Sequence, residues 1–252
     1  MTTEAPVAVV TGAGRGIGAA IARRLHRDGY HVVVADLDSD SAKRIADEVG
    51  GTPAPLDITD PDAAAELSAS LRRVDALVNN AGIFPPAPIA TVSPEQFRKV
   101  MDVNVLGTLI MTQAFIPQLT AAPDAAVVNV ASVAAKVVTP GTAAYSPSKA
   151  AVVSLTKLCA VELAEFGIRV NAVAPGGVLT EGTASVSADE EREARFDAVV
   201  PLGRRARPED IADAVPFFLG ADSRYVTGQV LYVDGGLTEA TINFLRAAQS
   251  PR

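Results

Sequence analysis

A tyrosine and a lysine four residues apart give the sequence its clearest chemical signal. Tyr145 and Lys149 open the segment from Ala143 to Gly176, most of which has the apolar pattern of a buried helix followed by a buried strand. Residues four apart share one face of a helix, so the two side chains would lie together. A phenol has a pKa of about 10, and an ammonium about 4 Å away would lower it by about three units at an effective dielectric of about 20. The pair therefore predicts a general acid–base that works near neutral pH.

Two other polar residues could serve the same chemistry. Ser132 ends the apolar run that begins at Ala125, and a hydroxyl there could hydrogen-bond a substrate oxygen and stabilise a developing alkoxide. Asn104 lies in an apolar stretch of a long predicted helix, where asparagine is a poor helix former. From the residues alone, Asn104 is also explained as a tolerated polar side chain.

Glycines fill alternate positions near the N-terminus. Gly12, Gly14, Gly16 and Gly18 follow a β-branched run and precede an amphipathic helical pattern. Glycine allows a sharp turn and lets backbone N–H groups approach a pyrophosphate, which the N-terminus of the next helix also attracts. The strict G-x-G-x-x-G form is absent because position 17 is Ile17. The order of strand, glycine loop and helix still predicts a dinucleotide site.

A carboxylate at the end of the next β-branched run bears on the choice of cofactor. Asp36 stands eighteen residues after Gly18, where it could accept hydrogen bonds from both ribose hydroxyls of the adenosine half of NAD. The same charge would repel a 2′-phosphate, and Leu37 offers no cation to receive one. Arg15 in the glycine loop is the opposing signal, because its guanidinium could reach such a phosphate. The balance favours NAD over NADP.

The elements that must position these residues alternate along the chain. Continuous apolar runs are typical of strands buried on both faces, and helical patterns separate them. The alternation predicts an α/β fold: one doubly wound domain over residues 1–252, with a mainly parallel seven-stranded sheet and helices on both faces. Its ligand would lie at the carboxyl ends of the strands. The predicted strands are Val7–Thr11, His31–Asp36, Ala76–Gly82, Ala125–Ser132, Ile168–Pro175, Gln229–Gly236 and, more weakly, Thr52–Asp57.

The predicted helices carry recognisable start and stop signals. One pattern runs from the glycine loop to Gly29, and another begins with Ser39 and Asp40 as capping candidates and stops at Gly50. A long pattern begins with Ser93 as its cap and continues to Leu119, and a further helix is expected from Arg207 to Gly220.

The polar, glycine-bearing segment from Gly176 to Ala206 departs from this alternation. Because it follows a strand end, it would border the ligand site. We expect a mobile lid on the substrate side. A solvated surface insertion, to which a helical pattern from Glu190 to Arg195 would belong, is the alternative.

Composition narrows the classes of partner. The net charge of −7 argues against nucleic acid or an anionic membrane surface. The single cysteine, Cys159, excludes an intrachain disulfide, and its apolar helical surroundings are typical of an inert core thiol. No residues show metal-ligand spacing, so no metal is expected. The chain shows neither a signal peptide nor an apolar run long enough to span a bilayer, which predicts a cytoplasmic protein.

Seven short motifs follow one another along the chain. They are Thr11–Gly18 (TGAGRGIG), Asp57, Asn79–Gly82 (NNAG), Asn104, Ser132, Tyr145–Lys149 (YSPSK) and Pro175–Thr180 (PGGVLT). In this order they resemble the short-chain dehydrogenase/reductase family, from about Pro6 to Gly236. The resemblance implies a single Rossmann-type domain and a nicotinamide dinucleotide cofactor.

The resemblance also implies roles for individual residues. Ser132, Tyr145, Lys149 and Asn104 would form the catalytic set. Asn104 would kink its helix and hold a water that joins Lys149 to solvent as a proton relay, and Lys149 would also hold the nicotinamide ribose. Around the cofactor, the implied contacts are Gly12, Gly16, Ile17 and Gly18 at the pyrophosphate, Asp57 and Ile58 at the adenine, Asn80, Ala81 and Gly82 beside the adenosine, and Val178 and Thr180 at the carboxamide. Arg15, Asp36, Leu37, Pro175 and Gly176 complete the predicted site.

The predicted activity is hydride transfer between NAD and a secondary alcohol or its ketone, with Tyr145 taking or giving the hydroxyl proton. Two alternatives stay open: an NADPH-dependent 3-oxoacyl-thioester reductase, and a dinucleotide-binding sensor or scaffold without turnover. Phe84, Pro85 and Pro86 would make one wall of the substrate pocket apolar, with Val133, Val138 and Leu179 as neighbours. This composition suggests a medium-sized hydrophobic or cyclic alcohol.

The long helical patterns carry apolar residues on more than one face. These patterns are Gln96–Phe115 and Tyr145–Phe166. One apolar face would pack on the sheet, and the other suggests burial against a second subunit. We expect a homotetramer or, failing that, a dimer. In the tail from Thr238 to Arg252, Ile242, Phe244 and Leu245 are apolar enough to dock across a subunit boundary.

Overall fold

The strands form one parallel sheet. In the computed structural model, which describes residues 5–138, 140–180 and 196–240, seven strands hydrogen-bond in the order β3–β2–β1–β4–β5–β6–β7. Every pairing is parallel, so the predicted seven-stranded, doubly wound fold is confirmed. The strands are β1 (Val7–Thr11), β2 (His31–Asp36), β3 (Thr52–Pro55), β4 (Ala76–Asn79), β5 (Ala126–Val130), β6 (Arg169–Pro175) and β7 (Val230–Val233). Residues 181–195 of the predicted lid, which include the helical pattern expected from Glu190 to Arg195, and the apolar tail from residue 241 lie outside the described residues.

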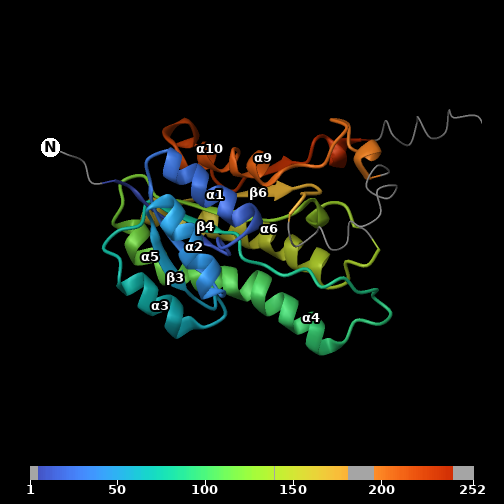
Figure 1. Cartoon of the computed structure of the whole chain (residues 1–252), viewed down its shortest axis with the longest axis horizontal. Helices are drawn as coiled ribbons and strands as arrows, with labels where there is room; N and C mark the ends of the chain where they lie inside the picture. Colours follow the sequence, from blue (N-terminus) through green and yellow to red (C-terminus); the bar gives the residue numbers. More distant parts are fainter. Residues whose placement is uncertain (1–4, 139, 181–195, 241–252) are drawn as a thin grey trace, which may run out of the picture.

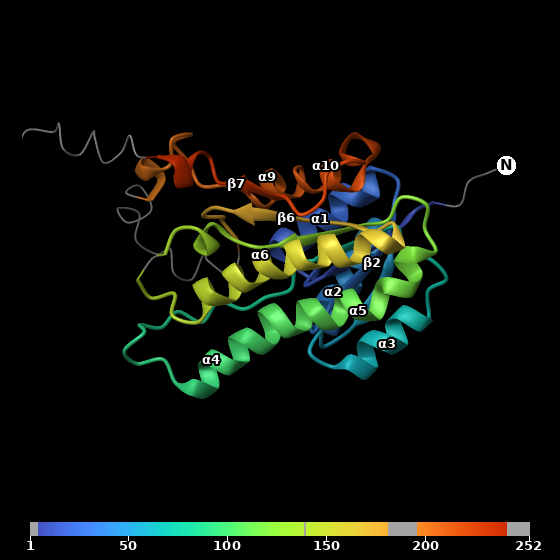
Figure 2. The same cartoon turned by 180° about the vertical axis from the view of Figure 1, so that it is seen from behind.

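Helices cover both faces of this sheet (Figures 1 and 2). On one face, α1, α2, α9 and α10 pack against strand side chains that include Val10 and Val34. On the other face, α3, α5 and α6 pack against neighbouring residues of the same strands, such as Val9 and Val33. Alternate residues therefore enter opposite cores, which is why the strands read as continuous apolar runs. The helices are α1 (Gly16–Arg27), α2 (Ser39–Val49), α3 (Pro61–Ala69), α4 (Pro94–Met101), α5 (Gly107–Thr120), α6 (Tyr145–Glu162), α9 (Pro208–Ala212) and α10 (Val215–Leu219).

The strand order reverses between β1 and β4. β2 and β3 follow β1 on one side, and β4 then pairs with β1 on its other side. In open α/β sheets, ligands bind at such a switch point, outside the carboxyl ends of the strands. The glycine loop leaves β1, Asn80 leaves β4, Ser132 follows β5 and Pro175 ends β6. The topology thus brings motifs from distant parts of the chain to one edge of the sheet.

The long helix that begins after Ser93 contains a bulge. Ser93 caps α4 by accepting a hydrogen bond from the N–H of Gln96 at 3.1 Å. A π-helical turn, η1 (Asp102–Leu106), then leads into α5, and the buried Asn104 lies within this turn. A π-helical turn widens the helix locally. The irregularity implied at Asn104 is therefore present as a π bulge.

By length and composition, the helix from Pro94 to Thr120 could cross a membrane. The expectation that no apolar run reaches this length is therefore wrong. Met111, Phe115 and Leu119 of this helix are fully buried in the core beneath the sheet. Its apolar character thus belongs to a core helix that covers the sheet.

The pattern from Arg207 to Gly220 forms two short helices, α9 and α10, rather than the single helix expected. Pro216 explains the break, because it has no N–H to donate to the carbonyl of Ala212 and its ring would clash with that carbonyl. A turn at residues 213–214 instead places Pro216 in the first turn of α10, where proline is tolerated.

Two smaller expectations also differ from the structure. The cap of α2 is Asp38, which accepts hydrogen bonds from the N–H groups of Asp40 and Ser41, so neither Ser39 nor Asp40 is the cap. The last strand, β7, lies at the edge of the sheet and leaves Leu231 exposed, so it is not buried on both faces.

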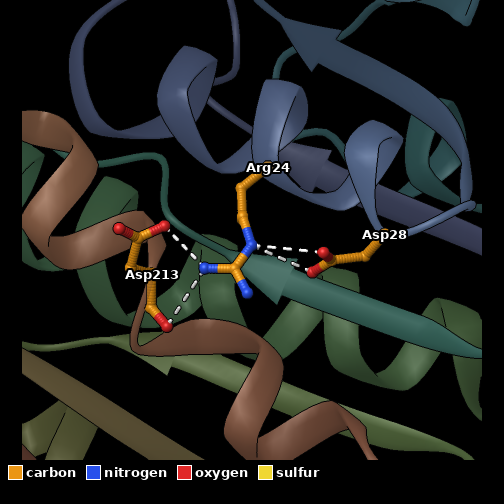
Figure 3. Close-up of polar contacts among 3 residues, drawn as sticks. All are labelled: Arg24, Asp28 and Asp213. Carbon is orange, nitrogen blue, oxygen red and sulfur yellow. Dashed lines mark hydrogen bonds and ion pairs between the residues drawn. The ribbon is translucent and has the colours of Figure 1, made fainter.

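Arg24 joins α1 to the end of α9 (Figure 3). Its Nη1 donates to Oδ1 of Asp213 at 2.5 Å, and its Nε donates to Oδ2 of Asp28 at 3.1 Å. Hydrogen bonding to Asp213 raises the pKa of Arg24. The contact fixes α9 against the helix that begins at the glycine loop.

Candidate active site

Two positions of the glycine loop exclude side chains for different reasons. A Cβ at Gly18 would lie 2.1 Å from the carbonyl oxygen of Gly12, which real contacts do not permit. Gly16 has a φ of +54°, in the left-handed region that disfavours other residues. The turn from β1 into α1 therefore depends on glycine at both positions.

The helix that follows this loop begins without a capping side chain. α1 has neither a side-chain cap nor an acidic residue in its first turn. By contrast, Asp38, Asp60 and Ser93 cap α2, α3 and α4. The first N–H groups of α1 and the positive end of its dipole are thus available to an anion. With the half-buried backbone of Gly12 and Gly16 beside it, this donor set fits the pyrophosphate of a dinucleotide.

Asp36 is held against the glycine loop. Its Oδ2 accepts a hydrogen bond from the N–H of Gly14 at 2.8 Å, and its Oδ1 accepts one from the N–H of Asp38 at 3.0 Å. The next residue, Leu37, is exposed. The carboxylate therefore stands where the adenosine end of a dinucleotide on this loop would lie.

Two guanidinium groups, those of Arg15 and Arg44, lie near Asp36 and the glycine loop. We call this region the adenosine corner. Hydrogen bonds from Ser41 hold the pKa of Asp38 below its usual range, with a smaller contribution from the charge of the exposed Arg15. Arg44, which the sequence analysis missed, donates from Nη2 to the carbonyl oxygen of Gly14 at 2.9 Å. The adenosine corner therefore combines carboxylates and guanidiniums.

Asn80 fastens the ends of β1 and β4 together. Its Nδ2 donates to the carbonyl oxygens of Thr11 and Gly12 at 2.9 and 3.0 Å. The N–H groups of Asn80 and Ala81 both donate to Oγ1 of Thr11. Two residues on, a Cβ at Gly82 would lie 3.5 Å from Nζ of Lys149, so the motif runs from the glycine loop to the buried lysine.

The residues predicted at the adenine and at the carboxamide lie on different loops of this edge, after β3 and after β6. Asp57 is exposed and accepts a hydrogen bond from the N–H of Thr59, whereas Ile58 is buried beneath Gly107. At the other end, a Cβ at Gly16 would lie 3.6 Å from Cγ2 of Thr180.

The chain reaches Thr180 from the end of β6. Pro175 is the last residue of β6, and Gly176 packs so closely that a Cβ there would lie 2.9 Å from Cα of Asp234. Val178 forms an isolated parallel bridge with Ala206. The segment from Pro175 to Thr180 therefore crosses from the sheet toward the glycine loop.

The phenol of Tyr145 meets the hydroxyl of Ser132. Tyr145 is the first residue of α6, and Ser132 is a buried residue just after β5. The Ser132 hydroxyl is hydrogen-bonded to Tyr145, and its Oγ accepts a hydrogen bond from the N–H of Ala134 at 3.1 Å. Burial raises the pKa of Tyr145, and the hydrogen bond with Ser132 partly opposes that rise.

Lys149 is buried one helical turn from Tyr145. Its Nζ donates to the carbonyl oxygen of Val130 at 2.8 Å and lies 5.8 Å from the centroid of the Tyr145 ring. Burial lowers the pKa of Lys149 to about 8. The expectation that this ammonium brings the Tyr145 pKa near neutrality is therefore wrong, because the pKa of Tyr145 is raised. Burial disfavours the charged form of both groups, which raises the pKa of an acid and lowers that of a base.

Asn104 ties three segments together. Its Oδ1 accepts a hydrogen bond from the N–H of Ile83 at 2.8 Å, and its Nδ2 donates to the carbonyl oxygen of Ile83 at 3.1 Å. Nδ2 also donates to Oγ of Ser148 at 3.0 Å, and that hydroxyl donates to the carbonyl oxygen of Tyr145 at 2.7 Å. The π bulge therefore places one amide between the segment after β4 and the start of α6.

Ser148 was not predicted from the sequence, and neither was a chain of buried hydrogen-bonded side chains in the core. Ser148 had a signal, because it follows Tyr145 by three residues and so shares its helix face. In the core, Nδ2 of Asn79 donates to Asn129 at 2.9 Å, and Nδ2 of Asn129 donates to Thr156 at 2.9 Å. The two asparagines interrupt apolar strands, which is the sequence signal for such a chain.

Other reactive side chains do not join the cluster. Cys159 lies in the core, where burial raises the pKa of its thiol. Among the described residues, no group of three or more His, Cys, Asp or Glu side chains could hold a metal ion. Ser132, Tyr145 and Lys149 are therefore the candidate catalytic residues on this edge, beside the glycine loop.

This fold and edge define a dinucleotide-binding oxidoreductase, and comparisons with known proteins identify its family. A family model described as enoyl-(acyl carrier protein) reductase matches residues 12–238. Cis-4-hydroxycyclohexanecarboxylate dehydrogenase of Sinomonas cyclohexanicum is 39% identical, over 92% of this chain and 96% of its own. The 3-oxoacyl-[acyl-carrier-protein] reductase of Thermotoga maritima is 36% identical, over 94% of this chain and 99% of its own. A variant of actinorhodin polyketide ketoreductase solved with NADPH is 33% identical, with a TM-score of 0.89, over 93% of this chain and 97% of its own.

The chain belongs to the short-chain dehydrogenase/reductase family. It is an oxidoreductase that acts on alcohol or ketone substrates with a nicotinamide dinucleotide cofactor. The family match also agrees with the apolar helix from Pro94 to Thr120 being a core helix of a soluble enzyme.

Proposed function

We propose that the protein transfers a hydride between NAD and a secondary alcohol or its ketone, with Tyr145 as general acid–base. The observation that carries this proposal is the cluster of Ser132, Tyr145 and Lys149 on the edge that also bears the glycine loop. A dinucleotide-binding sensor or scaffold would need the loop but not the cluster. The complete cluster therefore favours catalysis over that alternative.

The raised pKa of Tyr145 suits donation of its proton. In the reduction direction, the protonated phenol gives its proton to the carbonyl oxygen of the substrate as that oxygen gains negative charge. Ser132 hydrogen-bonds the same oxygen and stabilises the developing alkoxide. The bound nicotinamide supplies or accepts the hydride. In the oxidation direction, the phenol oxygen takes the hydroxyl proton instead.

Lys149 and Asn104 would support the phenol. Lys149, whose pKa is about 8, would exchange protons near neutral pH and hold the nicotinamide ribose. The side-chain amide of Asn104 is engaged by Ile83 and Ser148, which suits a role in fixing the positions of both segments. The water relay from Lys149 past Asn104 stays a prediction, as do carboxamide contacts from Val178 and Thr180.

NAD is the proposed cofactor because of Asp36. Its carboxylate, held by the N–H groups of Gly14 and Asp38, would accept ribose hydroxyls and repel a 2′-phosphate. Arg15 and Arg44 in the same corner favour NADP, as does the relative solved with NADPH. The carboxylate outweighs them in this proposal because its position after β2 is the one that contacts the ribose.

A second candidate is an NADPH-dependent 3-oxoacyl-thioester reductase. The relative from Thermotoga maritima that bears this name supports it. Asp36 argues against this candidate, because its carboxylate would repel the 2′-phosphate of NADPH. Turnover of an acetoacetyl thioester with NADPH, compared with turnover of simple alcohols with NAD, separates the two candidates.

The surroundings of the site are also proposals. Residues 1–252 would form one catalytic domain, with the segment 176–206 as a substrate-side lid, in a cytoplasmic enzyme. Leu106 on η1 and Leu158 and Val161 on α6 are exposed apolar side chains, and these exposed residues support a homotetramer or dimer. Leu106 and Leu155 of α6 also line a hollow of about 250 Å³. Static light scattering at micromolar concentration tests this assembly, and a monomer would contradict it.

The test of the proposed function compares two tyrosine variants. Tyr145→Phe keeps the ring and removes the acid–base, so we expect kcat to fall by about 100- to 10,000-fold while NADH binding persists. Tyr225, which is fully exposed, provides the control Tyr225→Phe with wild-type turnover. The measurement is nicotinamide absorbance with a panel of secondary alcohols and ketones. Near wild-type turnover of Tyr145→Phe would overturn the assignment.

A further inference from the structure

The ring of Phe84 lies against the ring of Tyr145. The two centroids are 4.6 Å apart and the planes are inclined by 51°. Phe84 is nevertheless 50% exposed. Aromatic side chains normally bury a large apolar area. One side of the Phe84 ring therefore contacts the proposed acid–base, and a large part of its surface stays open next to it.

Phe84 is held in this position by its backbone neighbours. On one side, Ile83 makes two hydrogen bonds with the buried amide of Asn104. On the other side, Ala87 donates to the carbonyl oxygen of Gly141 at 2.9 Å and accepts from the N–H of Ala143 at 3.2 Å. Pro85 and Pro86 between these points restrict the backbone further. The segment is therefore a fixed wall beside the start of α6.

The loops around this wall carry almost no charge. There is no charged residue from Gly82 to Ser93. Between Ser132 and Lys149 the only charged residue is Lys136, which is paired with Glu239. Val138 and Leu179, on the loops after β5 and β6, are exposed apolar residues. A ligand at Tyr145 thus meets the ring of Phe84, on a segment that carries no charged side chain.

We infer that Phe84 is a specificity-determining residue, whose open face receives the carbon skeleton of the substrate next to the reacting carbon. The substrate class is then a secondary alcohol or ketone on a ring or other compact apolar skeleton, rather than an open-chain polyol. The extra hydroxyls of a polyol would lose their hydrogen bonds to water against this wall. This inference rests on the proposed function and adds the class of substrate to it.

The test measures kcat/KM with NAD for cyclohexanol, 2-propanol and sorbitol. The wild-type protein should prefer cyclohexanol over sorbitol by about 100-fold or more. Phe84→Ala should lower kcat/KM for cyclohexanol by about 10- to 50-fold, mainly through KM, and for the smaller 2-propanol by less than about threefold. Phe84→Tyr should retain the preference, because the ring remains. NADH affinity, read by nicotinamide fluorescence, should be the same in every variant.

Phe217→Ala is the matched control. Phe217 is also half-exposed and lies 5.2 Å from a second ring, that of Phe218, on α10 away from this edge. Removal of the Phe217 ring should leave kcat/KM unchanged for both cyclohexanol and 2-propanol. If Phe84→Ala does not fold, Phe84→Leu makes the same comparison, since it keeps apolar volume and removes the flat ring.

Three results are decisive. An equal loss with cyclohexanol and 2-propanol would show that Phe84 only holds Tyr145, and would overturn the inference. A wild-type preference for sorbitol would also overturn it, while leaving hydride transfer intact. If the wild-type protein turns over none of these alcohols, nor the corresponding ketones with NADH, the proposed function itself fails.

Discussion

The two halves of the carboxyl edge are built from different parts of the chain. In the cofactor half, most contacts are made by backbone groups: the N–H of Gly14 on Asp36, the carbonyls that hold Asn80, and the uncapped start of α1. In the substrate half, side chains from distant segments meet, as Phe84 does with Tyr145 and Asn104 with Ser148. These contacts of the first half join side chains to backbone groups, whereas those of the second half join side chains to one another.

This difference matches what each half is proposed to bind. A pyrophosphate presents the same atoms in every dinucleotide, so a backbone cradle is sufficient for it. An alcohol substrate is distinguished by its carbon skeleton, which only side chains can recognise. We therefore expect substitutions in the cofactor half to affect all substrates equally, and substitutions in the substrate half to affect proton transfer or selectivity.

In the cofactor half, the largest effect is expected from Gly18→Ala. The added Cβ would lie 2.1 Å from the carbonyl oxygen of Gly12, so the loop or the start of α1 must move. We expect the Kd for NADH to rise by about 100-fold or more, a loss of about 3 kcal/mol. Nicotinamide fluorescence measures this Kd, and kcat/KM should fall equally for every alcohol.

Gly220→Ala is the control for a glycine change outside the site. Gly220 has a negative φ, and a Cβ there would come no nearer than 3.4 Å to another atom, the carbonyl oxygen of Pro216. It should bind NADH as the wild-type protein does. A Gly18→Ala protein that folds and retains wild-type NADH affinity would contradict the proposed difference between the two halves. The backbone of the glycine loop would then be unnecessary for binding the cofactor.

The next effect concerns the buried lysine in the substrate half. The pKa of Lys149 is lowered from 10.5 to about 8, so the unfolded chain binds more protons than the folded protein between these values. The free energy of unfolding should therefore rise with pH, by about 2 kcal/mol between pH 8 and 10. Above pH 10 the raised pKa of Tyr145 acts in the opposite direction, because the phenol of the unfolded chain ionises first.

Urea unfolding of the ligand-free protein at several pH values measures this contribution. Lys149→Met should remove about 2 kcal/mol from the rise between pH 8 and 10. Lys157→Met changes an exposed lysine on the same helix and should leave the rise unchanged. Equal pH dependence in the wild-type and Lys149→Met proteins would contradict the pKa ascribed to burial.

Local patterns predicted the architecture well. Apolar runs marked six of the seven strands, and β3 was the weaker candidate. The contact of Asp36 with the glycine loop is present, while the cofactor contacts of both stay a prediction. These features depend on neighbours within one strand–loop–helix unit. The one expected helix that forms as two, α9 and α10, also has a local cause. Pro216 within the helical pattern marks the break between them.

The substrate half could be predicted only in part. Tyr145 and Lys149 share a helix face, as their spacing requires, yet the direction of the Tyr145 pKa was wrong. Spacing reports the distance between charges but not their burial, which depends on how the whole sheet and its loops pack. The contact of Phe84 with Tyr145 joins residues 61 positions apart, and no local pattern contains it.

The smallest effect is expected at the adenosine corner, where Asp36→Asn removes one charge from an otherwise similar side chain. Without that charge the repulsion of a 2′-phosphate weakens, and one acceptor for the ribose is lost. We expect the ratio of kcat/KM for NAD to that for NADP to fall by about tenfold, a difference of about 1.4 kcal/mol. The ratio should fall by the same factor with a ring alcohol and with 2-propanol, since the corner belongs to the cofactor half.

Asp38→Asn tests whether the preference for NAD comes from direct contact of the Asp36 carboxylate with the ribose or from the total negative charge near it. Asp38 lies two residues further on and caps α2, and asparagine is an equally good cap, so this variant removes a charge without loosening the helix. If Asp36 acts by direct contact with the ribose, Asp38→Asn should change the NAD to NADP ratio by less than about twofold, because exposed charges are screened. Equal shifts in the two variants would mean that the corner discriminates by its overall field. The backbone-built half would then select its cofactor through long-range charge, rather than through the single carboxylate that Gly14 holds in place.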